Sequence, residues 1–177
     1  ADLINRYNRG EMTNADSIHF PQSQKYTTLK LGRTVYGGGG IMPDYFVPLD
    51  TTRYTNYHRQ LVAKGAVIKA TLDYVDQHRA EMLKTYKKFA DYERSFAIPE
   101  SLSRQLIDDG NESGATYNET EYQKSKPLID LQLKALIARD LWGMNEYYQV
   151  INQSDPVVLK ALELLAAPDF ESLLRKK

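Results

Sequence analysis

The histidines are the first residues whose chemistry could define a site in this 177-residue chain. His58 and His78 fall in predicted helices, and neither has a second histidine or a Glu-x-x-His partner at ligand spacing. A metal site would therefore need carboxylates that the sequence does not organise. We expect His19, His58 and His78 to lie at the surface or at the edge of the core. Cysteine is absent, which excludes thiolate ligands, cysteine nucleophiles and disulfides.

The serines lack a context that would activate a nucleophile. No Gly-x-Ser-x-Gly elbow occurs in the sequence. Ser101, Ser103 and Ser125 are expected at helix starts or on helix surfaces, where they cap the helix or face solvent.

Asp108 and Asp109 are an adjacent carboxylate pair within a stretch rich in Gly, Asn and Ser, which runs from Asp108 to Thr120 and predicts a mobile loop. Carboxylates in such a loop would lack the burial that shifts a pKa for acid–base work. The sequence therefore predicts no catalytic residue, no cofactor-binding residue and no metal ligand.

Four consecutive glycines, Gly37 to Gly40, are the most unusual local feature. A phosphate-binding loop requires a helix N-terminus directly after the glycines, usually with a lysine and a hydroxyl. Here Ile41-Met42-Pro43-Asp44 follows, and the proline argues against a helix at that point. We therefore favour a tight backbone turn, or a close approach to another element at positions where a Cβ would clash.

The elements around the glycines are strands. Strand-forming residues occur at 26–29, 35–36 and 45–47, with a turn at Gly32-Arg33. This pattern predicts two or three short antiparallel strands near residues 25–49, too few for an independent sheet. They would pair with strands outside this chain, or pack as a ribbon on helices.

Helical periodicity dominates elsewhere. A short helix over 2–9 ends at Gly10. Beyond residue 50 the spacing of apolar residues predicts helices over 51–65 (capped by Asp50, Thr51 or Thr52), 66–96, 99–110, 118–142 and 157–166. Asn118 with Glu121 forms the cap of the fourth of these, and Pro127 restarts or kinks it.

Two of these helices carry apolar patterns that predict how they pack. The residues from 127 to 142 form two apolar stripes, which predicts burial between partners on both sides. The helix over 66–96 has one stripe, formed by Ile68, Leu72, Val75, Met82, Tyr86 and Phe89. The predicted fold is mainly α with a small β segment (α+β), in which a helical bundle or helical hairpins follow the strands. The predicted domains are 1–50 and 51–177.

Composition excludes some classes of partner. Lysine plus arginine number 23 and aspartate plus glutamate 23, so the net charge of zero gives no footprint for nucleic acid or an anionic membrane. No stretch approaches the roughly 20 apolar residues that span a bilayer. The 13 tyrosines suit an interface, although ordinary surface tyrosines would look the same.

Residues 32–48, Gly-Arg-Thr-Val-Tyr-Gly-Gly-Gly-Gly-Ile-Met-Pro-Asp-Tyr-Phe-Val-Pro, closely resemble a signature of carboxy-terminal processing (tail-specific) serine peptidases. In that family a Gly-Arg pair precedes a short strand, a glycine-rich turn and a Gly-Ile-x-Pro-Asp motif, which Gly40, Ile41, Pro43 and Asp44 match. The sequence from 125 to 160 is similar to the C-terminal extension of the Bacteroidetes versions. One departure is the turn before the glycines, which is longer than the family pattern and lacks its proline.

The resemblance implies a parent enzyme with an export signal, a PDZ domain that binds substrate C-termini, and a protease core with a serine nucleophile and a lysine base. Both catalytic residues lie upstream of the matching segment in that family, so no residue here inherits their roles. We expect residues 1–50 to end the protease domain and 51–177 to be a helical scaffold, with a homodimer through the helical region as a hypothesis. The resemblance also implies the periplasm or cell envelope.

Two alternatives belong to other classes. A stand-alone helical protein-binding module without enzymatic activity predicts a start codon just before Ala1, whereas the absence of an initiator Met suggests a piece of a longer protein. A small hydrolase acting alone predicts activity of the isolated chain on an unstructured protein such as casein. We expect none.

Overall fold

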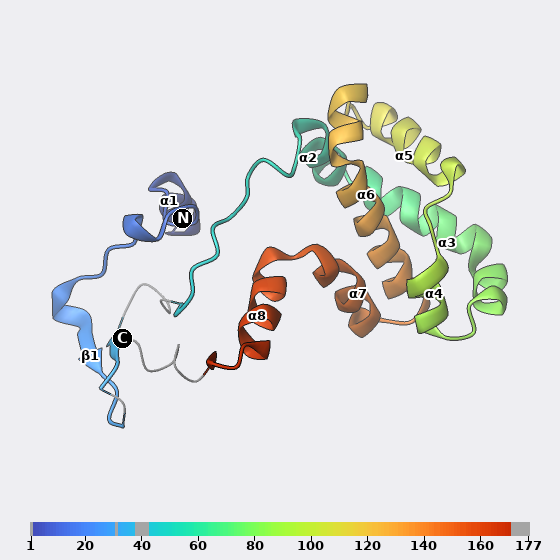
Figure 1. Ribbon diagram of the computed structural model, residues 1–177. Coiled ribbons are helices and arrows are strands. Elements are labelled where there is room, and N and C mark those ends of the chain that lie inside the picture. Colours follow the sequence, from blue (N-terminus) through green and yellow to red (C-terminus); the bar gives the residue numbers. More distant parts are fainter. Residues whose placement is uncertain (1, 31, 38–42, 171–177) are drawn as a thin grey trace. The chain divides into compact units, whose positions relative to one another are not determined.

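The computed structural model describes residues 2–30, 32–37 and 43–170. The predicted class, mainly α with a small β segment, is confirmed within these residues. The α-helices are α1 (Asp2–Asn8), α2 (Asn56–Ala63), α3 (Ala66–Thr85), α4 (Phe89–Ser95), α5 (Glu100–Glu112), α6 (Glu119–Leu141), α7 (Met144–Ile151) and α8 (Pro156–Ala166) (Figure 1). The strands are β1 (Lys25–Thr27) and β2 (Thr34–Tyr36), and the 3-10 turns are η1 (Ala15–Ser17), η2 (Gln22–Gln24) and η3 (Asn152–Ser154).

Internal contacts divide the chain into two units. The helical unit is Thr51–Asp155, and the second unit joins Ala1–Asp50 with the segment that begins at Pro156. The contacts group α8 with the N-terminal segment rather than with the other helices. In the part of the chain that is described, no helix is both long enough and apolar enough to cross a membrane.

Helix α6 is the central element of the helical unit, because α2, α3 and α7 all pack against it, while α5 packs on α3. Both of its predicted apolar stripes contribute buried side chains, so the prediction of burial on two sides is confirmed. The buried residues of this stretch are Ile129, Leu133, Ala135, Leu136, Ile137 and Ala138. Pro127 lies inside α6, which runs through it without a restart.

Tyrosines supply part of this core. Tyr57, Tyr92 and Tyr122 are almost fully buried, and the Tyr92 hydroxyl donates to the Lys134 carbonyl at 2.8 Å. Rings of Tyr86, Tyr92 and Phe96 meet with centroids 4.8–6.0 Å apart. Several tyrosines that composition alone would assign to an interface therefore pack between helices.

The predicted stripe on α3 is wrong in its first half. Ile68 and Leu72 are 49% and 44% exposed, whereas Val75 and Met82 are buried as expected. The other residues that face the core from α3 are Ala66, Val67, Ala70, Thr71 and Tyr74. Alanines let the helix backbones approach closely, and an apolar count that favours large side chains misses them. The predicted helix over 66–96 is also broken, because α3 ends before Tyr86 and α4 starts at Phe89.

The predicted loop from Asp108 to Thr120 is also wrong, because α5 continues to Glu112 and α6 starts at Glu119. Gly110 lies within α5, where a Cβ would stand 2.6 Å from Leu61 Cδ2 of α2. The glycine therefore permits close approach of α2 and α5 rather than ending the helix. The predicted cap of α6 is confirmed, since Asn118 Oδ1 accepts from the Glu121 N–H at 3.0 Å.

Helix α2 starts later than the sequence predicted, with Thr55 rather than residues 50–52 as its N-cap. The segment before it is fastened to the other end of the helical unit, where the Arg53 guanidinium donates to the Ser154 carbonyl at 2.9 Å. The first and last residues of the helical unit therefore lie close together.

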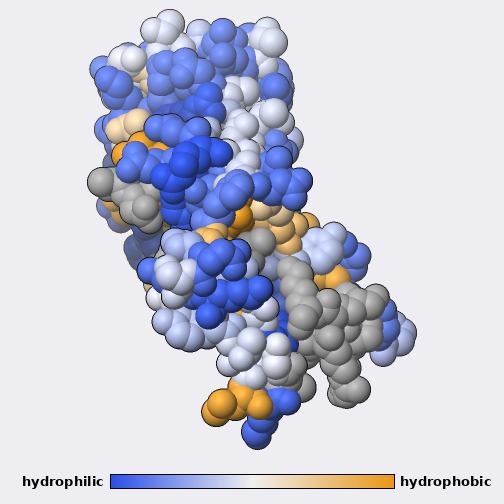
Figure 2. All heavy atoms as spheres, turned by 90° about the vertical axis from the view of Figure 1, so that its left-hand side faces the viewer, coloured by the Kyte–Doolittle hydropathy of each residue, from blue (hydrophilic) through white to orange (hydrophobic). Residues whose placement is uncertain are grey.

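The second unit has a different character. Among its described side chains only Glu11 is buried, and Arg6 and Arg9 pair with it at 2.9 and 2.6 Å. Its strands form an antiparallel ribbon, and residues 45–47 are not a strand. Large apolar side chains are exposed on α1 and α8, namely Leu3, Ile4, Tyr7, Val157, Leu159, Leu162 and Leu165. Figure 2 shows apolar groups at the surface among polar ones.

Burial predicts a sharp difference between two leucines that the sequence pattern treats alike. Leu102 of α5 is fully buried, so Leu102→Ala should lower the free energy of unfolding by about 2–5 kcal/mol. Leu72→Ala is the matched control on α3 and should cost less than about 1 kcal/mol. Urea denaturation followed by circular dichroism measures both changes. Equal losses would mean that α3 presents the face predicted by the sequence.

Candidate functional site

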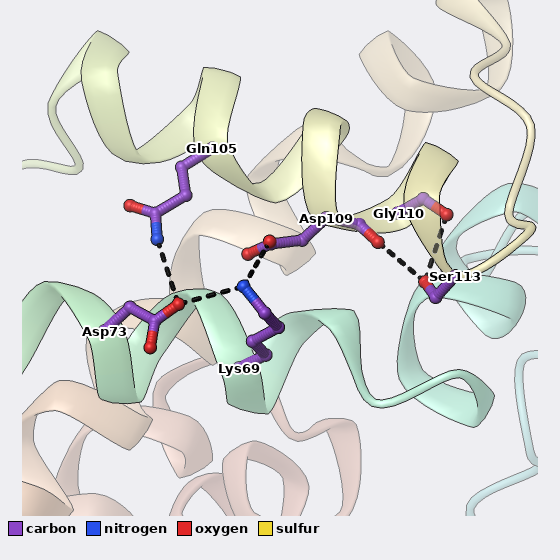
Figure 3. Close-up of polar contacts among 6 residues, drawn as sticks. All are labelled: Lys69, Asp73, Gln105, Asp109, Gly110 and Ser113. Atoms are coloured by element: carbon purple, nitrogen blue, oxygen red, sulfur yellow. Dashed lines mark hydrogen bonds and ion pairs between the residues drawn. The ribbon is translucent and has the colours of Figure 1, made fainter.

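One polar cluster of the helical unit joins α3 to α5 (Figure 3). Lys69 and Asp73 lie one turn apart on α3, and Gln105 and Asp109 lie one turn apart on α5. Lys69 Nζ donates to Asp109 Oδ1 at 2.5 Å and to Asp73 Oδ2 at 3.0 Å. Gln105 Nε2 lies 3.4 Å from the same Asp73 oxygen. Asp109 is buried, which corrects its predicted position in a solvated loop.

The charges of this cluster argue against catalysis by its lysine. The hydrogen bond that Lys69 donates to Asp109, followed by the one that it donates to Asp73, raises the pKa of Lys69 above its ordinary value. A lysine that acts as a base or nucleophile requires the opposite shift, because only the neutral amine accepts a proton or attacks carbon. Lys69 therefore stays protonated and links the two helices.

Ser113 lies beside the cluster, but its hydroxyl is hydrogen-bonded to the end of α5. Its hydroxyl is placed to donate to the carbonyls of Asp109 and Gly110, at 2.7 and 3.0 Å (Figure 3). These bonds satisfy helix-terminal carbonyls, which is a structural role. Since Lys69 is protonated, it cannot activate this hydroxyl as a general base.

Lys134 of α6 shows the shift that Lys69 lacks, because burial lowers its pKa. Its Nζ nevertheless donates to the carbonyls of Glu93 and Phe96, both at 2.8 Å. Both carbonyls belong to the end of α4, where a cation is favoured by the helix dipole. The lysine thus closes α4 against α6 and has its donors aimed at backbone rather than at a substrate.

A second polar group forms the junction of α2 with α6. The Thr55 hydroxyl oxygen lies 2.8 Å from Ser125 Oγ, and the Thr55 N–H donates to Ser125 Oγ at 3.1 Å. The Tyr57 N–H donates to the Glu121 carboxylate at 2.5 Å. One helix therefore supplies the side chains that satisfy the free N–H groups at the start of another.

This junction corrects the predicted roles of two serines. Ser125 is fully buried and Ser103 is 5% exposed, so neither faces solvent. Ser101 is exposed, as expected. The position of Ser125 could not be read from spacing, because the residue that it contacts is 70 positions away in the chain.

Each of the three histidines lies in a different local setting. His58 is buried in α2 with Nε2 3.0 Å from Gln132 Oε1, so the ring donates from Nε2. His19 and His78 each place Nδ1 2.9 Å from a backbone carbonyl, of Ser17 and Tyr74. Over residues 2–30, 32–37 and 43–170, no three metal-ligating side chains come together. His58 belongs to the core itself rather than to its edge.

The glycine-rich segment falls partly outside the described residues, since Gly38 to Met42 are not among them. At Gly37 a Cβ would stand 2.7 Å from Tyr26 Cε2, so the ring of β1 covers this glycine. The predicted close approach is confirmed at this position. Arg33 and Asp44, from the two ends of the motif, form an ion pair. Both contacts are made with other residues of the same chain.

Comparison with known proteins gives one match. Residues 57–143, slightly less than half of the chain, match a family described as a family of unknown function (DUF8443). The matched segment begins in α2 and ends just after α6, so the similarity covers most of the helical unit. No curated protein and no solved structure matches the chain.

Burial of His58 predicts a pH-dependent stability. Desolvation lowers the pKa of His58, with a smaller contribution of the same sign from Arg59, while the hydrogen bond to Gln132 opposes the shift. The folded state therefore binds this proton less readily than the unfolded state. The contribution of neutral His58 to the free energy of unfolding is full above the unfolded pKa of about 6.5, and it is lost as the pH falls below that value toward the folded pKa.

We expect the free energy of unfolding of the helical unit to fall between about pH 7.5 and pH 5.5, and His58→Phe to flatten this dependence. The variant will be less stable at both pH values, because it loses the bond to Gln132, so the slope rather than the absolute value is diagnostic. His19→Phe is the matched control for an exposed histidine and should leave the slope unchanged. An unaltered slope in His58→Phe would show that other groups cause the dependence.

Proposed function

We propose that this chain is the C-terminal, non-catalytic region of an exported carboxy-terminal processing serine peptidase. Residues 1–50 contribute a small β segment that completes the protease domain, and the helical unit acts as a scaffold. The parent enzyme cleaves proteins at or near their C-termini with a serine–lysine dyad outside this chain. Its location is the periplasm or cell envelope.

The observation that carries this proposal is the resemblance of residues 32–48 to the peptidase signature. Two contacts give parts of that signature a structural reason. The Arg33–Asp44 ion pair joins its beginning to the Pro-Asp that follows the glycines, and the Tyr26 ring lies where a Cβ at position 37 would stand, so a larger residue there would displace the ring. The motif therefore supports a role in shaping backbone rather than in binding a ligand.

The absence of a core in the second unit supports the same proposal. No described apolar side chain of residues 2–50 or 156–170 is buried, and the ribbon has only three residues in each strand. A two-stranded ribbon of this size is marginal in water by itself. A larger protein around it would supply the apolar surface that this unit lacks.

The geometry of the polar clusters supports a non-catalytic role. Lys69 donates to carboxylates of two helices, Lys134 and Ser113 donate to backbone carbonyls, and Ser125 bonds the N-cap of α2. Peptide hydrolysis by a serine–lysine pair requires a neutral lysine within hydrogen-bond reach of the serine hydroxyl. The carboxylates that bind Lys69 keep it protonated, and the Lys134 amine donates to carbonyls at the end of α4.

The activity of the parent is tested with the protein encoded by the whole reading frame. We expect that protein to degrade casein, and substitution of its serine or its lysine to abolish the activity. The isolated 177-residue chain should release no peptides from casein. Activity of the isolated chain, or a reading frame that starts just before Ala1, would contradict the proposal and leave a hydrolase or a stand-alone binding module.

Self-association of the helical region, residues 51–177 and thus including α8, is part of the proposal. Helix α8 exposes Leu159, Leu162 and Leu165 at 48–61% of their surface, and an apolar helix is normally covered. We propose that a second copy covers this face.

Sedimentation velocity over a wide concentration range tests this, with Leu162→Glu plus Leu165→Glu expected to shift the chain toward monomer. Glu163→Leu plus Lys160→Leu is a control that enlarges the apolar face and should strengthen the association. A strict monomer at the highest concentration would count against it.

A further inference from the structure

We propose that the outer edge of β2 is a docking edge for one further β-strand, supplied by the protease domain of the same polypeptide. This inference rests on the proposed function and deepens it, since it assigns the contact to two backbone positions. Those positions are Thr34 and Tyr36 in the ribbon shown in Figure 1.

The register of the ribbon determines which backbone groups point outward. The Gly37 N–H donates to the Gln24 carbonyl at 2.8 Å, and the Thr28 N–H donates to the Arg33 carbonyl at 2.9 Å. Hydrogen-bonded and non-bonded pairs alternate along an antiparallel ladder. The pair midway between these two, Tyr26 with Val35, is therefore bonded within the ribbon.

The remaining pairs are Lys25 with Tyr36 and Thr27 with Thr34, and both are non-bonded pairs. In such pairs the N–H and C=O groups of each residue point away from the partner strand. Thr34 and Tyr36 thus present two donors and two acceptors along the outer edge of β2. Extended backbone is the group that matches donors and acceptors two residues apart.

The two edges of the ribbon differ in how they are protected. On the β1 side the Lys25 N–H already donates to the Gln22 carbonyl, and the lysine itself is a charge of the kind that guards sheet edges. The β2 side is Thr-Val-Tyr, with neither a charge nor a proline. Its residues favour strands, and Val35 is exposed. The β2 edge, which lacks this protection, is therefore the one suited to pairing with another strand.

The size of the edge favours a tethered strand over a second molecule. A stable complex of two proteins buries about 1,200–2,000 Å², far more than pairing along three residues provides. Association of separate molecules also loses translational and rotational entropy. A strand of the same polypeptide loses much less, because the covalent link already holds it near the edge. The edge therefore suits a strand of the same polypeptide, which under the proposed function is a strand of the peptidase domain.

Two matched substitutions test the assignment in the protein encoded by the whole reading frame. Thr34→Pro removes an outward donor from β2, and Thr27→Pro removes the equivalent donor from β1, directly opposite. Neither change removes a bond within the ribbon, and proline is tolerated where an edge N–H faces solvent. We expect Thr34→Pro to lower the melting temperature and Thr27→Pro to leave it nearly unchanged.

Amide hydrogen exchange supplies a second measurement that does not depend on a substitution. In the full-length protein the amides of Thr34 and Tyr36 should exchange about a hundredfold more slowly than in the 177-residue chain, where neither donates to a backbone carbonyl of the described residues. The amide of Val35 is the internal control, because its partner within the ribbon is present in both proteins.

The outcomes separate this inference from the proposed function. An active peptidase in which Thr34 and Tyr36 exchange freely would overturn the docking edge and leave the proposed function standing. Slow exchange in a full-length protein without peptidase activity would support the docking edge and contradict the proposed function. Equal effects of the two proline substitutions would overturn the choice of β2. Protection that appears in the 177-residue chain only at high concentration would overturn the tethered strand in favour of a second copy.

Discussion

Burial of α6 on two sides is the constraint on which the helical unit depends. Helices α2, α3 and α7 pack against it, and its buried residues include Ala135 and Ala138 as well as large apolar side chains. Since those neighbours meet on a shared helix, a polar side chain at each meeting point needs a partner. Ser125 and Glu121 of α6 meet the start of α2, and Lys134 meets the end of α4. The polar groups buried in this unit thus serve mainly to join helices.

This arrangement gives the polar clusters of the helical unit a structural role. Hydrogen bonds that fasten helices hold their donors and acceptors in fixed geometry, and a carboxylate beside Lys69 stabilises its charged form. Catalytic groups need the opposite, a shifted pKa and a free direction toward a substrate. The polar clusters of the helical unit are therefore better understood as helix junctions.

The two units differ in how they obtain stability. The helical unit has a continuous core from Tyr57 to Val150, and its family match lies within that region. The second unit has a charged cluster at Glu11 and a ribbon whose one face is partly covered where Phe20 stacks on Tyr36 at 4.2 Å. Stacking and ion pairs at the surface contribute little stability compared with a core. That difference supports the proposal that other parts of a longer protein surround this unit.

The sequence by itself determined the features that depend on near neighbours. The class of fold, the cap at Asn118, the two-sided burial of α6 and the covered glycine at Gly37 all follow from short spacings or from residue type. Tertiary structure decided which face of α3 is buried, because Ala66 and Ala70 allow a close approach that outweighs the greater hydrophobicity of Ile68 and Leu72. It also decided the burial of Asp109 and Ser125, whose partners Lys69 and Thr55 lie 40 and 70 residues away. Local periodicity carries no information on such distant pairs, so only the packed helices reveal them.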